Sequence, residues 1–364
     1  MLPAPRQVII NGKFLSAESS GVRRVAVALV KHCHRLLAEE PELSSQISMQ
    51  LWVPGSAAEQ ARALGVPYQI IGPFDGRLWE HATLPAKAGS RLILSLCNVG
   101  PLPSRHAVTM IHDAQIYMTP KSYTLPYRIW HRFQQTNIGH RHARILTVSE
   151  FSRRQLAGYG VTKKDRIGVV LNGVDHGVDI SPDPTILDQL DLRAGKYVLA
   201  LANIKAHKNI GVLLRAFARP ALVDIPLILF GADGRTQFEQ QGMSIPQNVR
   251  FAGKIDDAQL RALYKSALCL AFPSLTEGFG LPPLEAMREG CPSVVSPTGA
   301  LPEVCGDAAI YADPHDPAAW AAEILKLSND VALRQTLVQR GKEQAARFTW
   351  DKAARTLIRE LMSI

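Results

Sequence analysis

Short apolar runs alternate with amphipathic segments through the second half of the chain. The apolar runs predict buried strands at 196–202, 226–230, 249–251, 267–272, 292–295 and 308–311. Apolar residues at helical spacing predict helices at 210–217, 257–265 and 284–288. Such alternation is typical of βαβ units, in which helices connect the strands of a parallel sheet.

The first half of the chain has the same pattern. Strands are predicted at 8–10, 49–53, 92–96, 107–111 and 145–148, and a helix at 22–39. Two more helices, at 330–347 and 350–362, are predicted at the C-terminal end of the chain. The stretch 175–195 is rich in Asp, Pro and Gly, which favours a linker between the two series. We therefore predict an N-terminal Rossmann-like domain at 1–177, a linker at 178–195 and a C-terminal Rossmann-like domain at 196–348.

This α/β organisation places two parallel sheets on either side of a predicted cleft. Ligands of open α/β sheets bind outside the carboxyl ends of the strands. Functional residues should therefore lie in the loops that follow strands.

Composition restricts the class of protein. Among the 364 residues, 46% are apolar and 20% are charged, which supplies buried cores and excludes an intrinsically disordered chain. The five cysteines form no Cys-x-x-Cys pair, so a reducing, cytoplasmic location is expected. No apolar run approaches about 18 residues, and the N-terminal sequence leads into a strand pattern, so neither a membrane span nor a signal peptide is expected.

Positive charge is concentrated in the first half. Residues 1–177 hold 21 Lys and Arg against 11 Asp and Glu, whereas residues 178–364 hold 20 against 21. Residues 114–149 contain no acid and interleave basic with aromatic side chains. Such a segment is compatible with an anionic membrane interface, with nucleic-acid binding or with a solvated basic face.

The most informative motif follows the predicted strand 267–272. Gly278 and Gly280 allow the backbone to approach a ligand, and the helix start that follows favours a phosphate. Glu277 and Glu285 flank this turn, eight residues apart. A carboxylate accepts two hydroxyl hydrogen bonds at once, so the pair suits the diols of a ribose and a sugar.

Other chemistries lack their motifs in the sequence. There is no Asp-x-Asp pair and no His-Glu-x-x-His, so no metal site is expected. There is also no Gly-x-Ser-x-Gly elbow, no Gly-x-Gly-x-x-Gly after a strand and no Gly-x₄-Gly-Lys-Ser/Thr loop. Acyl transfer and hydride transfer are therefore disfavoured.

Taken together, the motifs and their order resemble glycosyltransferase family 4, the large family of retaining GT-B enzymes. The segments that carry the resemblance are spread over nearly the whole chain: Asn11 to Ser16, Gly21 to Arg24, His112-Asp113, Thr147 to Arg154, Leu171 to Asp175, Ala202 to Asn209, Glu277 to Ala286, Gly290 to Val294, Leu301 to Asp307 and Trp350. The resemblance implies a GT-B fold in which a C-terminal helix, 349–364, packs back on the N-terminal, acceptor-side domain.

The resemblance also implies roles for individual residues of the donor site. Glu285 should hold the nucleotide ribose, and Glu277 should hold hydroxyls of the transferred sugar. Lys208 should neutralise the diphosphate, close to the backbone of the donor-binding turn. That turn comprises Gly278, Phe279, Gly280 and Leu281.

Two further positions are implied in the first half. Gly21 should let the N-terminal loop approach the phosphate, and His112 should lie beside the reacting sugar, without serving as the general base. One position departs from the family. Many members carry Arg where this chain has Asn203, and Lys205 either supplies that charge or is a solvated side chain.

The expected function is therefore retaining transfer of a sugar from a nucleoside-diphosphate sugar, without metal or other cofactor, during polysaccharide assembly. A resemblance to bacterial mannosyl- and rhamnosyltransferases favours GDP-mannose as donor. The expected acceptor is a glycan or a polyprenyl-diphosphate-linked sugar, with peripheral contact to the inner face of an anionic membrane and no nucleic acid. A GT-B sugar-nucleotide epimerase and a non-catalytic binding protein for anionic lipid or nucleic acid are the alternatives.

Overall fold

The structure, a computed structural model, describes residues 4–17, 20–175 and 180–364. The chain forms two compact units, one of Met1–Gly173 with Thr349–Ile364 and the other of Val174–Phe348. The expected boundary at 177/178 and the first residues of the expected linker lie outside the described residues. From residue 180 onward, the expected linker groups with the second unit. Among the described residues, no helix combines the length and apolar character needed to cross a membrane.

The first unit is built on a parallel sheet of seven strands in the order β3-β2-β1-β4-β5-β6-β7. The strands are β1 (Arg6–Asn11), β2 (Ile47–Val53), β3 (Tyr68–Ile70), β4 (Leu92–Ser95), β5 (Ala107–Met110), β6 (Arg144–Thr147) and β7 (Ile167–Val169). Central β1 pairs with β2 on one side and β4 on the other, so Val8 faces both Met49 and Leu92. The strand order reverses at β1, which makes the β1/β4 edge the switch point.

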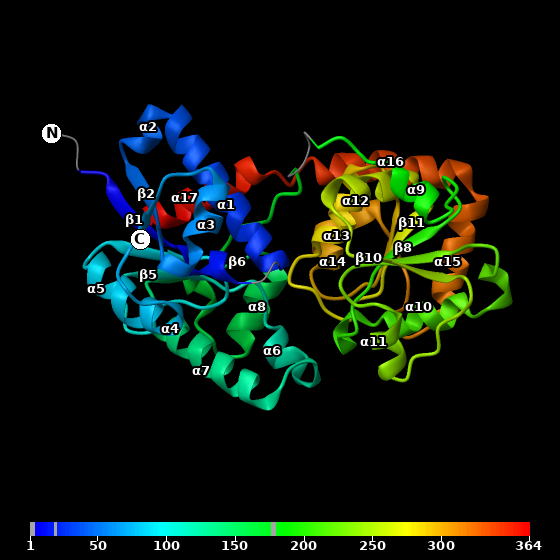
Figure 1. The fold of residues 1–364 in the computed structure, drawn as a ribbon, viewed down its shortest axis with the longest axis horizontal. Helices are drawn as coiled ribbons and strands as arrows, with labels where there is room; N and C mark the ends of the chain where they lie inside the picture. The colour runs from blue at the N-terminus through cyan, green and yellow to red at the C-terminus, as the bar shows by residue number, and fades with distance from the viewer. Residues whose placement is uncertain (1–3, 18–19, 176–179) are drawn as a thin grey trace. The chain divides into compact units, whose positions relative to one another are not determined.

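Helices cover this sheet (Figure 1). They are α1 (Gly21–Glu39), α2 (Pro41–Ser44), α3 (Ala58–Leu64), α4 (Gly76–Leu78), α5 (Leu84–Ala88), α6 (Gln115–Met118), α7 (Leu125–Arg141), α8 (Glu150–Gly158) and α17 (Trp350–Met362). Helix α17 packs against α1, and Arg355 of α17 pairs with Glu40 at 2.5 Å. The C-terminal helix thus completes the core of the first unit, as the expected GT-B fold requires.

The second unit repeats the architecture with six parallel strands in the order β10-β9-β8-β11-β12-β13. The strands are β8 (Val198–Leu201), β9 (Leu227–Phe230), β10 (Val249–Gly253), β11 (Cys269–Phe272), β12 (Ser293–Val295) and β13 (Ile310–Tyr311). Alternate residues of these strands, such as Val198, Leu227 and Cys269, pack with Phe217, Phe238 and Trp320 into one core. The switch point lies between β8 and β11, which pair directly through Val198 and Cys269.

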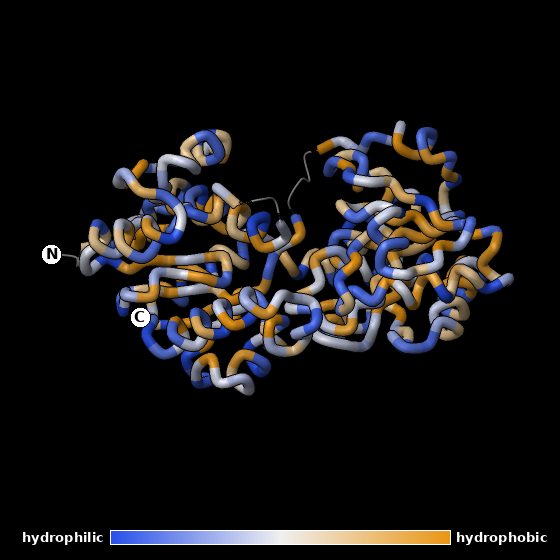
Figure 2. The backbone as a smooth tube through the Cα atoms, turned by 60° about the horizontal axis from the view of Figure 1, so that its bottom comes forward, coloured by the Kyte–Doolittle hydropathy of each residue, from blue (hydrophilic) through white to orange (hydrophobic). Residues whose placement is uncertain are grey.

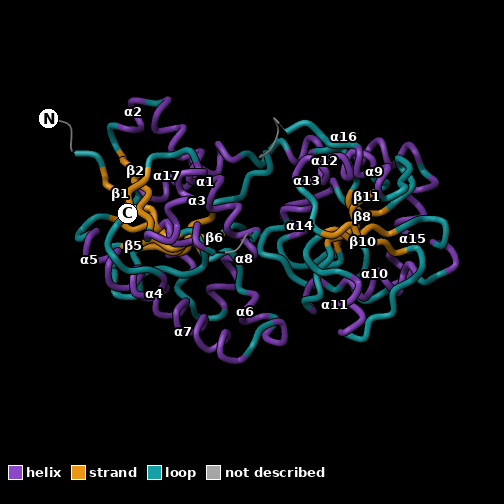
Figure 3. The backbone as a smooth tube through the Cα atoms, in the orientation of Figure 1, coloured by secondary structure: helices purple, strands orange, loops and turns teal. Residues whose placement is uncertain are grey.

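The helices of the second unit surround its strands, as they do in the first (Figure 3). They are α9 (Thr185–Gln189), α10 (Ile210–Phe217), α11 (Arg235–Gln240), α12 (Asp257–Ser266), α13 (Leu281–Arg288), α14 (Leu301–Cys305), α15 (Pro317–Asn329) and α16 (Val331–Ala345). Figure 2 shows hydrophobic segments concentrated in the strands inside each unit. All eleven strands expected from the apolar runs are present, and the two-unit α/β fold is confirmed.

Candidate active site

The donor-site residues expected from the sequence gather at the switch point of the second sheet. The loop after β8 contains Asn203, Lys205 and Lys208, and the loop after β11 contains Glu277 and the glycine turn. Because β8 and β11 are neighbours, their carboxyl ends bring the two loops together. The backbone N–H of Leu275 donates to the His207 carbonyl at 2.7 Å and joins them.

Lys208 and Glu277 form an ion pair across these loops. The Lys208 ammonium donates to Glu277 Oε1 at 2.6 Å, and the two side chains are 17% and 10% exposed. The ammonium also lies 5.6 Å from the centre of the Phe272 ring. An ammonium has three donors and a carboxylate has two oxygens, so each group retains bonding capacity for a ligand while the other fixes its position.

The loop after β12 packs against the backbone of Glu277. Gly299 has φ +65°, and a Cβ at this position would lie 2.5 Å from the Glu277 nitrogen. The Ala300 N–H donates to the Glu277 carbonyl at 3.0 Å, and the Thr298 hydroxyl donates to the Ser274 carbonyl at 2.7 Å. The close approach requires glycine and holds the backbone of Glu277 in place.

The glycine turn leads directly into α13. Gly280 has φ +103°, and a Cβ there would lie 2.6 Å from Leu301 Cδ2. Prolines at the start of the helix fix its first turn, and no side chain caps it. Backbone N–H groups at such a helix start suit a phosphate or another anion.

Glu285 lies one turn into α13 and is only 7% exposed. It therefore emerges from the same helix whose start adjoins Glu277. The sequence-predicted residues Gly278 and Phe279 are buried at the turn, and the Phe279 ring packs edge-on to Phe348 with centroids 5.7 Å apart. Glu277 thus precedes the first residue of α13 by four residues, and Glu285 lies within that helix, one turn from its start.

The basic loop contains an exposed lysine and a buried histidine just before Lys208 in sequence. Asn203 Oδ1 accepts from the Lys205 N–H at 3.0 Å, so the Asn203 side chain shapes the loop itself. Lys205 is exposed, whereas His207 is buried. Burial, together with the nearby Lys208 charge, lowers the pKa of His207 to about 4, so this imidazole is neutral at pH 7.

His112 lies at the carboxyl end of β5 in the first unit, where a backbone carbonyl and the Asn98 side chain hold it. Its Nε2–H donates to the Leu96 carbonyl at 2.8 Å, and its N–H donates to Asn98 Oδ1 at 2.7 Å. Burial lowers the pKa of His112 to about 4. The ring is therefore neutral at pH 7, and Nδ1 is left as a hydrogen-bond acceptor.

Gly21 is the first residue of α1, which begins near the end of β4. Ser20 caps this helix by accepting from the Arg23 N–H at 3.2 Å, and Cys97 Sγ lies 3.9 Å from the Val22 carbonyl. Among the described residues, no atom lies within 4 Å of the position that a Cβ on Gly21 would take. Packing within the first unit therefore does not require glycine here.

Sequence reasoning missed a buried polar network at the switch point of the first sheet. Glu80 is 1% exposed in a π-helical turn, and its carboxylate accepts from Asn11 Nδ2 at 2.9 Å and Lys13 Nζ at 2.5 Å. Asn11 also donates to Ser95 Oγ at 3.0 Å. Alternation of apolar residues could not reveal Glu80, because its partners come from strands far away in sequence. Asn98 and Gly299 were missed for the same reason.

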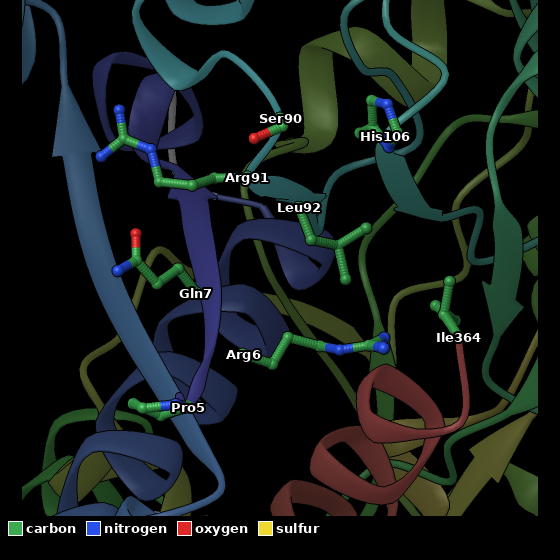
Figure 4. A pocket seen from close by; sticks show the side chains of 8 residues that line it. All are labelled: Pro5, Arg6, Gln7, Ser90, Arg91, Leu92, His106 and Ile364. Atoms are coloured by element: carbon green, nitrogen blue, oxygen red, sulfur yellow. The ribbon is translucent and has the colours of Figure 1, made fainter. Parts of the chain in front are cut away.

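The potential metal ligands, the cysteines and one cavity among the described residues do not form a ligand site. In the described part of the chain, no three His, Cys, Asp or Glu residues gather as a metal site would require, and all five cysteines are free. A cavity of about 420 Å³ lies at the amino edge of the first sheet, lined by Arg6, Arg91 and His106 among others. Figure 4 shows Arg6 and Arg91 pointing away from each other, so the two cations do not converge on one ligand.

Comparison with known proteins identifies relatives of this chain. The profile described as glycosyl transferases group 1 matches residues 186–344, which contain the whole loop and helix arrangement around Glu277. O-antigen chain mannosyltransferase B of Escherichia coli is 35% identical over 266 residues, covering 69% of this chain and 69% of that protein. O-antigen chain mannosyltransferase RfbU of Salmonella typhimurium is 24% identical over 280 residues, covering 75% and 74%.

A solved structure supports the fold over the full length. HepE of Anabaena, in complex with UDP and glucose, superposes with a TM-score of 0.71 at 16% identity, covering 99% of this chain and 100% of that chain. The resemblance expected from the sequence is confirmed. The chain belongs to the glycosyl transferases group 1 family and is a sugar-transferring enzyme.

Proposed function

We propose that the protein transfers mannose, with retention, from a nucleoside-diphosphate sugar to a glycan acceptor during polysaccharide assembly. GDP-mannose is the favoured donor, because the relative at 35% identity is an O-antigen mannosyltransferase. The observation that carries the proposal is the Lys208–Glu277 pair at 2.6 Å beside the start of α13. This arrangement presents a fixed cation, a hydroxyl acceptor and helix N–H groups at one edge of a sheet.

Each donor-site residue has a distinct role in the proposal. Lys208 binds the diphosphate. Lys205 supplies a second, more exposed cation, in place of the arginine that many family members carry at the position of Asn203. Glu277 accepts hydroxyls of the sugar, and Glu285 accepts the ribose diol. The N–H groups of the turn contact the sugar and the diphosphate. These groups come from Phe279, Gly280 and Leu281, with Gly278 allowing the close approach.

The proposed reaction needs stabilisation of a leaving anion. The bond from the sugar C1 to the diphosphate oxygen breaks, and a bond from the acceptor hydroxyl oxygen to C1 forms. The hydroxyl proton passes to the leaving phosphate on the same face of the sugar, which preserves the configuration. Lys208 and the helix start stabilise the charge that develops on the phosphate, so no metal or other cofactor is required.

The first unit supplies the acceptor side in this proposal. His112 is neutral, so its Nδ1 accepts a hydrogen bond from a sugar hydroxyl and orients it. Gly21 leaves the start of α1 open to a phosphate. A polyprenyl-diphosphate-linked sugar is a suitable acceptor, because residues 114–149 of the first unit are free of acids and include exposed apolar side chains of α7.

The face that α7 turns to solvent is apolar. Leu125, Ile129 and Phe133 follow one another at intervals of one helical turn and are 61%, 62% and 53% exposed. The opposite face of the same helix buries Gln134 and Gln135. We call the three exposed residues the α7 ridge. An apolar ridge within an acid-free, basic segment suits the interface of an anionic membrane, so we propose peripheral contact at the inner face of the cytoplasmic membrane.

A panel of nucleotide sugars tests the proposed function. Purified protein is incubated with GDP-mannose, UDP-glucose, UDP-galactose or dTDP-rhamnose and with a mannose-containing oligosaccharide, with and without EDTA. We expect glycosylated oligosaccharide and free nucleoside diphosphate from GDP-mannose, equally in both arms. An altered nucleotide sugar without a transfer product would indicate an epimerase. Absence of any nucleoside diphosphate would indicate a binding protein, and loss of activity in EDTA restored by Mg²⁺ would overturn metal independence.

A further inference from the structure

The chain passes between the two units at two places, and each unit holds its ends of these connections together. The boundaries fall between Gly173 and Val174 and between Phe348 and Thr349. In the second unit, the Val174 N–H donates to the Phe348 carbonyl at 3.0 Å. In the first unit, a Cβ on Gly173 would collide with the Trp350 nitrogen, so this close approach requires glycine. The two connections are therefore paired with each other.

The first connection is fixed to the end of α13. Arg288, the last residue of this helix, donates from Nη1 to the Val174 carbonyl and from Nη2 to Glu289 Oε1 at 2.8 Å. The Glu289 side chain is 4% exposed and also accepts from Arg261 of α12, at 3.0 and 3.3 Å. Arg261 donates in turn to the Ile180 carbonyl. One buried carboxylate thus orients two guanidinium groups, and each of them holds a backbone carbonyl just past the first connection.

The second connection is fixed to the start of α13. Phe348 is 8% exposed, and its ring packs edge-on to Phe279 of the glycine turn with centroids 5.7 Å apart. Edge-to-face packing fixes the relative orientation of two rings in addition to burying their area. Phe279 also supplies one of the N–H groups proposed to contact the donor. The position of this donor-binding backbone therefore depends on Phe348.

Val174 joins these two attachments. Its N–H donates to Phe348, whose ring contacts the turn before α13, and its carbonyl accepts from Arg288 at the end of α13. The same helix carries Glu285, the residue proposed to hold the ribose. Both ends of the donor-binding helix are thus attached to one residue of the connection. We call Phe348, Val174 and Arg288 the α13 network.

We propose that Phe348 and Arg288 are positioning residues of the donor site, which act through Val174 to hold the glycine turn in the geometry that binds the nucleotide sugar. Neither side chain touches the substrate in this proposal. Arg288 influences the turn at the opposite end of α13 through Val174 and Phe348, and not along the helix. This inference rests on the proposed function, since it presumes that the turn binds a nucleoside-diphosphate sugar.

Conservative substitutions weaken the α13 network at either end. Arg288→Lys keeps a charge beside Glu289 but loses the forked guanidinium that also reaches the Val174 carbonyl. Phe348→Leu keeps an apolar side chain but loses the edge of the ring. Arg235→Lys is the matched control, because the Arg235 guanidinium likewise contacts one carboxylate and one backbone carbonyl of the second unit, at 3.7 and 3.3 Å.

Residue-resolved hydrogen exchange, recorded without any ligand, tests whether the network reaches the turn. Two amides serve as reporters. The Ala300 N–H donates to the Glu277 carbonyl at 3.0 Å and reports on the donor site. The Leu227 N–H donates to the Asn248 carbonyl at 2.9 Å and reports on the sheet of the second unit.

We expect Arg288→Lys and Phe348→Leu each to speed exchange at Ala300 at least about fivefold, and to leave the rate at Leu227 within about twofold. Arg235→Lys should leave both rates unchanged. An unchanged rate at Ala300 in Arg288→Lys would overturn the proposal. Equal acceleration at Leu227, or the same acceleration in Arg235→Lys, would also overturn it, because the effect would then be general destabilisation.

Steady-state kinetics with varied GDP-mannose tests whether the two residues act through one path. We expect each single variant to raise the donor KM about fivefold. The double variant should stay within about twofold of the more affected single variant, because members of one network are not additive. A double variant in which the two effects multiply would overturn the proposal. A wild type that transfers no sugar would instead contradict the proposed function, whereas the exchange rates test the α13 network without any substrate.

Discussion

Lys208 and Glu277 lie on loops from neighbouring strands, 69 residues apart in the chain, and meet in a hydrogen-bonded ion pair of 2.6 Å. Each group is mostly withdrawn from water, with side-chain exposures of 17% and 10%. Partial burial strengthens the field that either charge exerts on a ligand. The pair therefore acts as a preorganised unit, whose members we expect to differ in what they contribute to binding and to turnover.

The two carboxylates of the donor site should affect different kinetic parameters. Glu285→Ala should mainly raise the donor KM, since each lost charge-assisted hydrogen bond costs about 1.5–3 kcal/mol. Glu277→Ala should mainly lower kcat, because its contacts strengthen as the sugar develops charge. Steady-state kinetics with varied donor distinguishes the two effects. Unchanged kinetics in both variants would refute this assignment of the site.

The two lysines of the basic loop should contribute unequally to turnover. Lys208→Ala should lower kcat by about 10²-fold, as expected for a lost preorganised contact to a developing anion. Lys205 is exposed and therefore more strongly screened, so Lys205→Ala should cost about five- to tenfold. Turnover at 0.05 M and 0.5 M salt checks this, because only the Lys205 contribution should fade with salt. Wild-type turnover in Lys205→Ala would make Lys205 a solvated side chain.

Gly299 should be indispensable for a steric reason. An added Cβ would lie 2.5 Å from the Glu277 nitrogen and 2.9 Å from its carbonyl oxygen, and φ at this position is +65°. Gly299→Ala should therefore displace Glu277 and lower kcat at least about tenfold while the fold is retained, as checked by circular dichroism. Gly211→Ala is the control, since its Cβ would meet only the end of the Arg215 side chain at 3.4 Å. Equal activity of the two variants would contradict the role of Gly299.

The buried histidines should make the protein acid-sensitive. The pKa of His142 is lowered to about 4, mainly by burial, and that of His112 likewise. Below pH 6.5 these two histidines become protonated in the unfolded chain but stay neutral in the folded chain. The free energy of unfolding therefore falls as the pH drops from about 6.5 to about 4, and it is unaffected above pH 7. Each histidine contributes up to about 3 kcal/mol of this loss.

Thermal midpoints at pH 7.5 and pH 5 test the effect. His142→Gln should reduce the difference between the two midpoints, because glutamine does not titrate. His106→Gln, at an exposed position, should leave that difference as in the wild type. The same pH dependence in His142→Gln and in the wild type would show that His142 is not the cause.

The α7 ridge should bind anionic membranes. Vesicles that contain acidic phospholipid should float the wild type at 0.1 M salt and release part of it at 1 M, where the Debye length falls from about 10 Å to about 3 Å. Serine at Leu125, Ile129 and Phe133 together should abolish flotation. Val223→Ser, at an apolar residue 63% exposed in the second unit, is the control. Flotation that is absent in the wild type, or unchanged in the triple variant, would leave α7 without a membrane role.

Much of the fold was predictable, because both sheets are parallel and buried on both faces. Their strands consist of consecutive apolar residues, as in Leu227–Phe230, and such runs are visible without any partner. β3 and β7 were not predicted from the sequence, because neither is a continuous apolar run: Gln69 interrupts β3 and Gly168 interrupts β7. α7 has no buried apolar stripe of helical period, since its inner face holds glutamines, and so its bounds could not be predicted.

The donor-site residues could be identified from motifs within short segments of the chain. Their contacts with one another could not be predicted in this way. Glu277 and Glu285 are eight residues apart around one turn, so their proximity follows from a strand-to-helix junction. The Lys208–Glu277 pair depends instead on β8 and β11 being neighbours, which no single segment specifies. The same holds for Glu80, whose partners Asn11 and Lys13 lie at the end of β1 and just after it.

The central claim is that the Lys208–Glu277–Glu285 arrangement drives sugar transfer from a nucleotide donor. The most direct test measures, in one time course, nucleoside diphosphate released and sugar incorporated into the acceptor, for the wild type and for the Lys208→Ala/Glu285→Ala double variant. We predict equal molar amounts of the two products from the wild type, and neither above background from the folded double variant. A wild type that releases no nucleoside diphosphate, or a double variant that matches it, would contradict the claim.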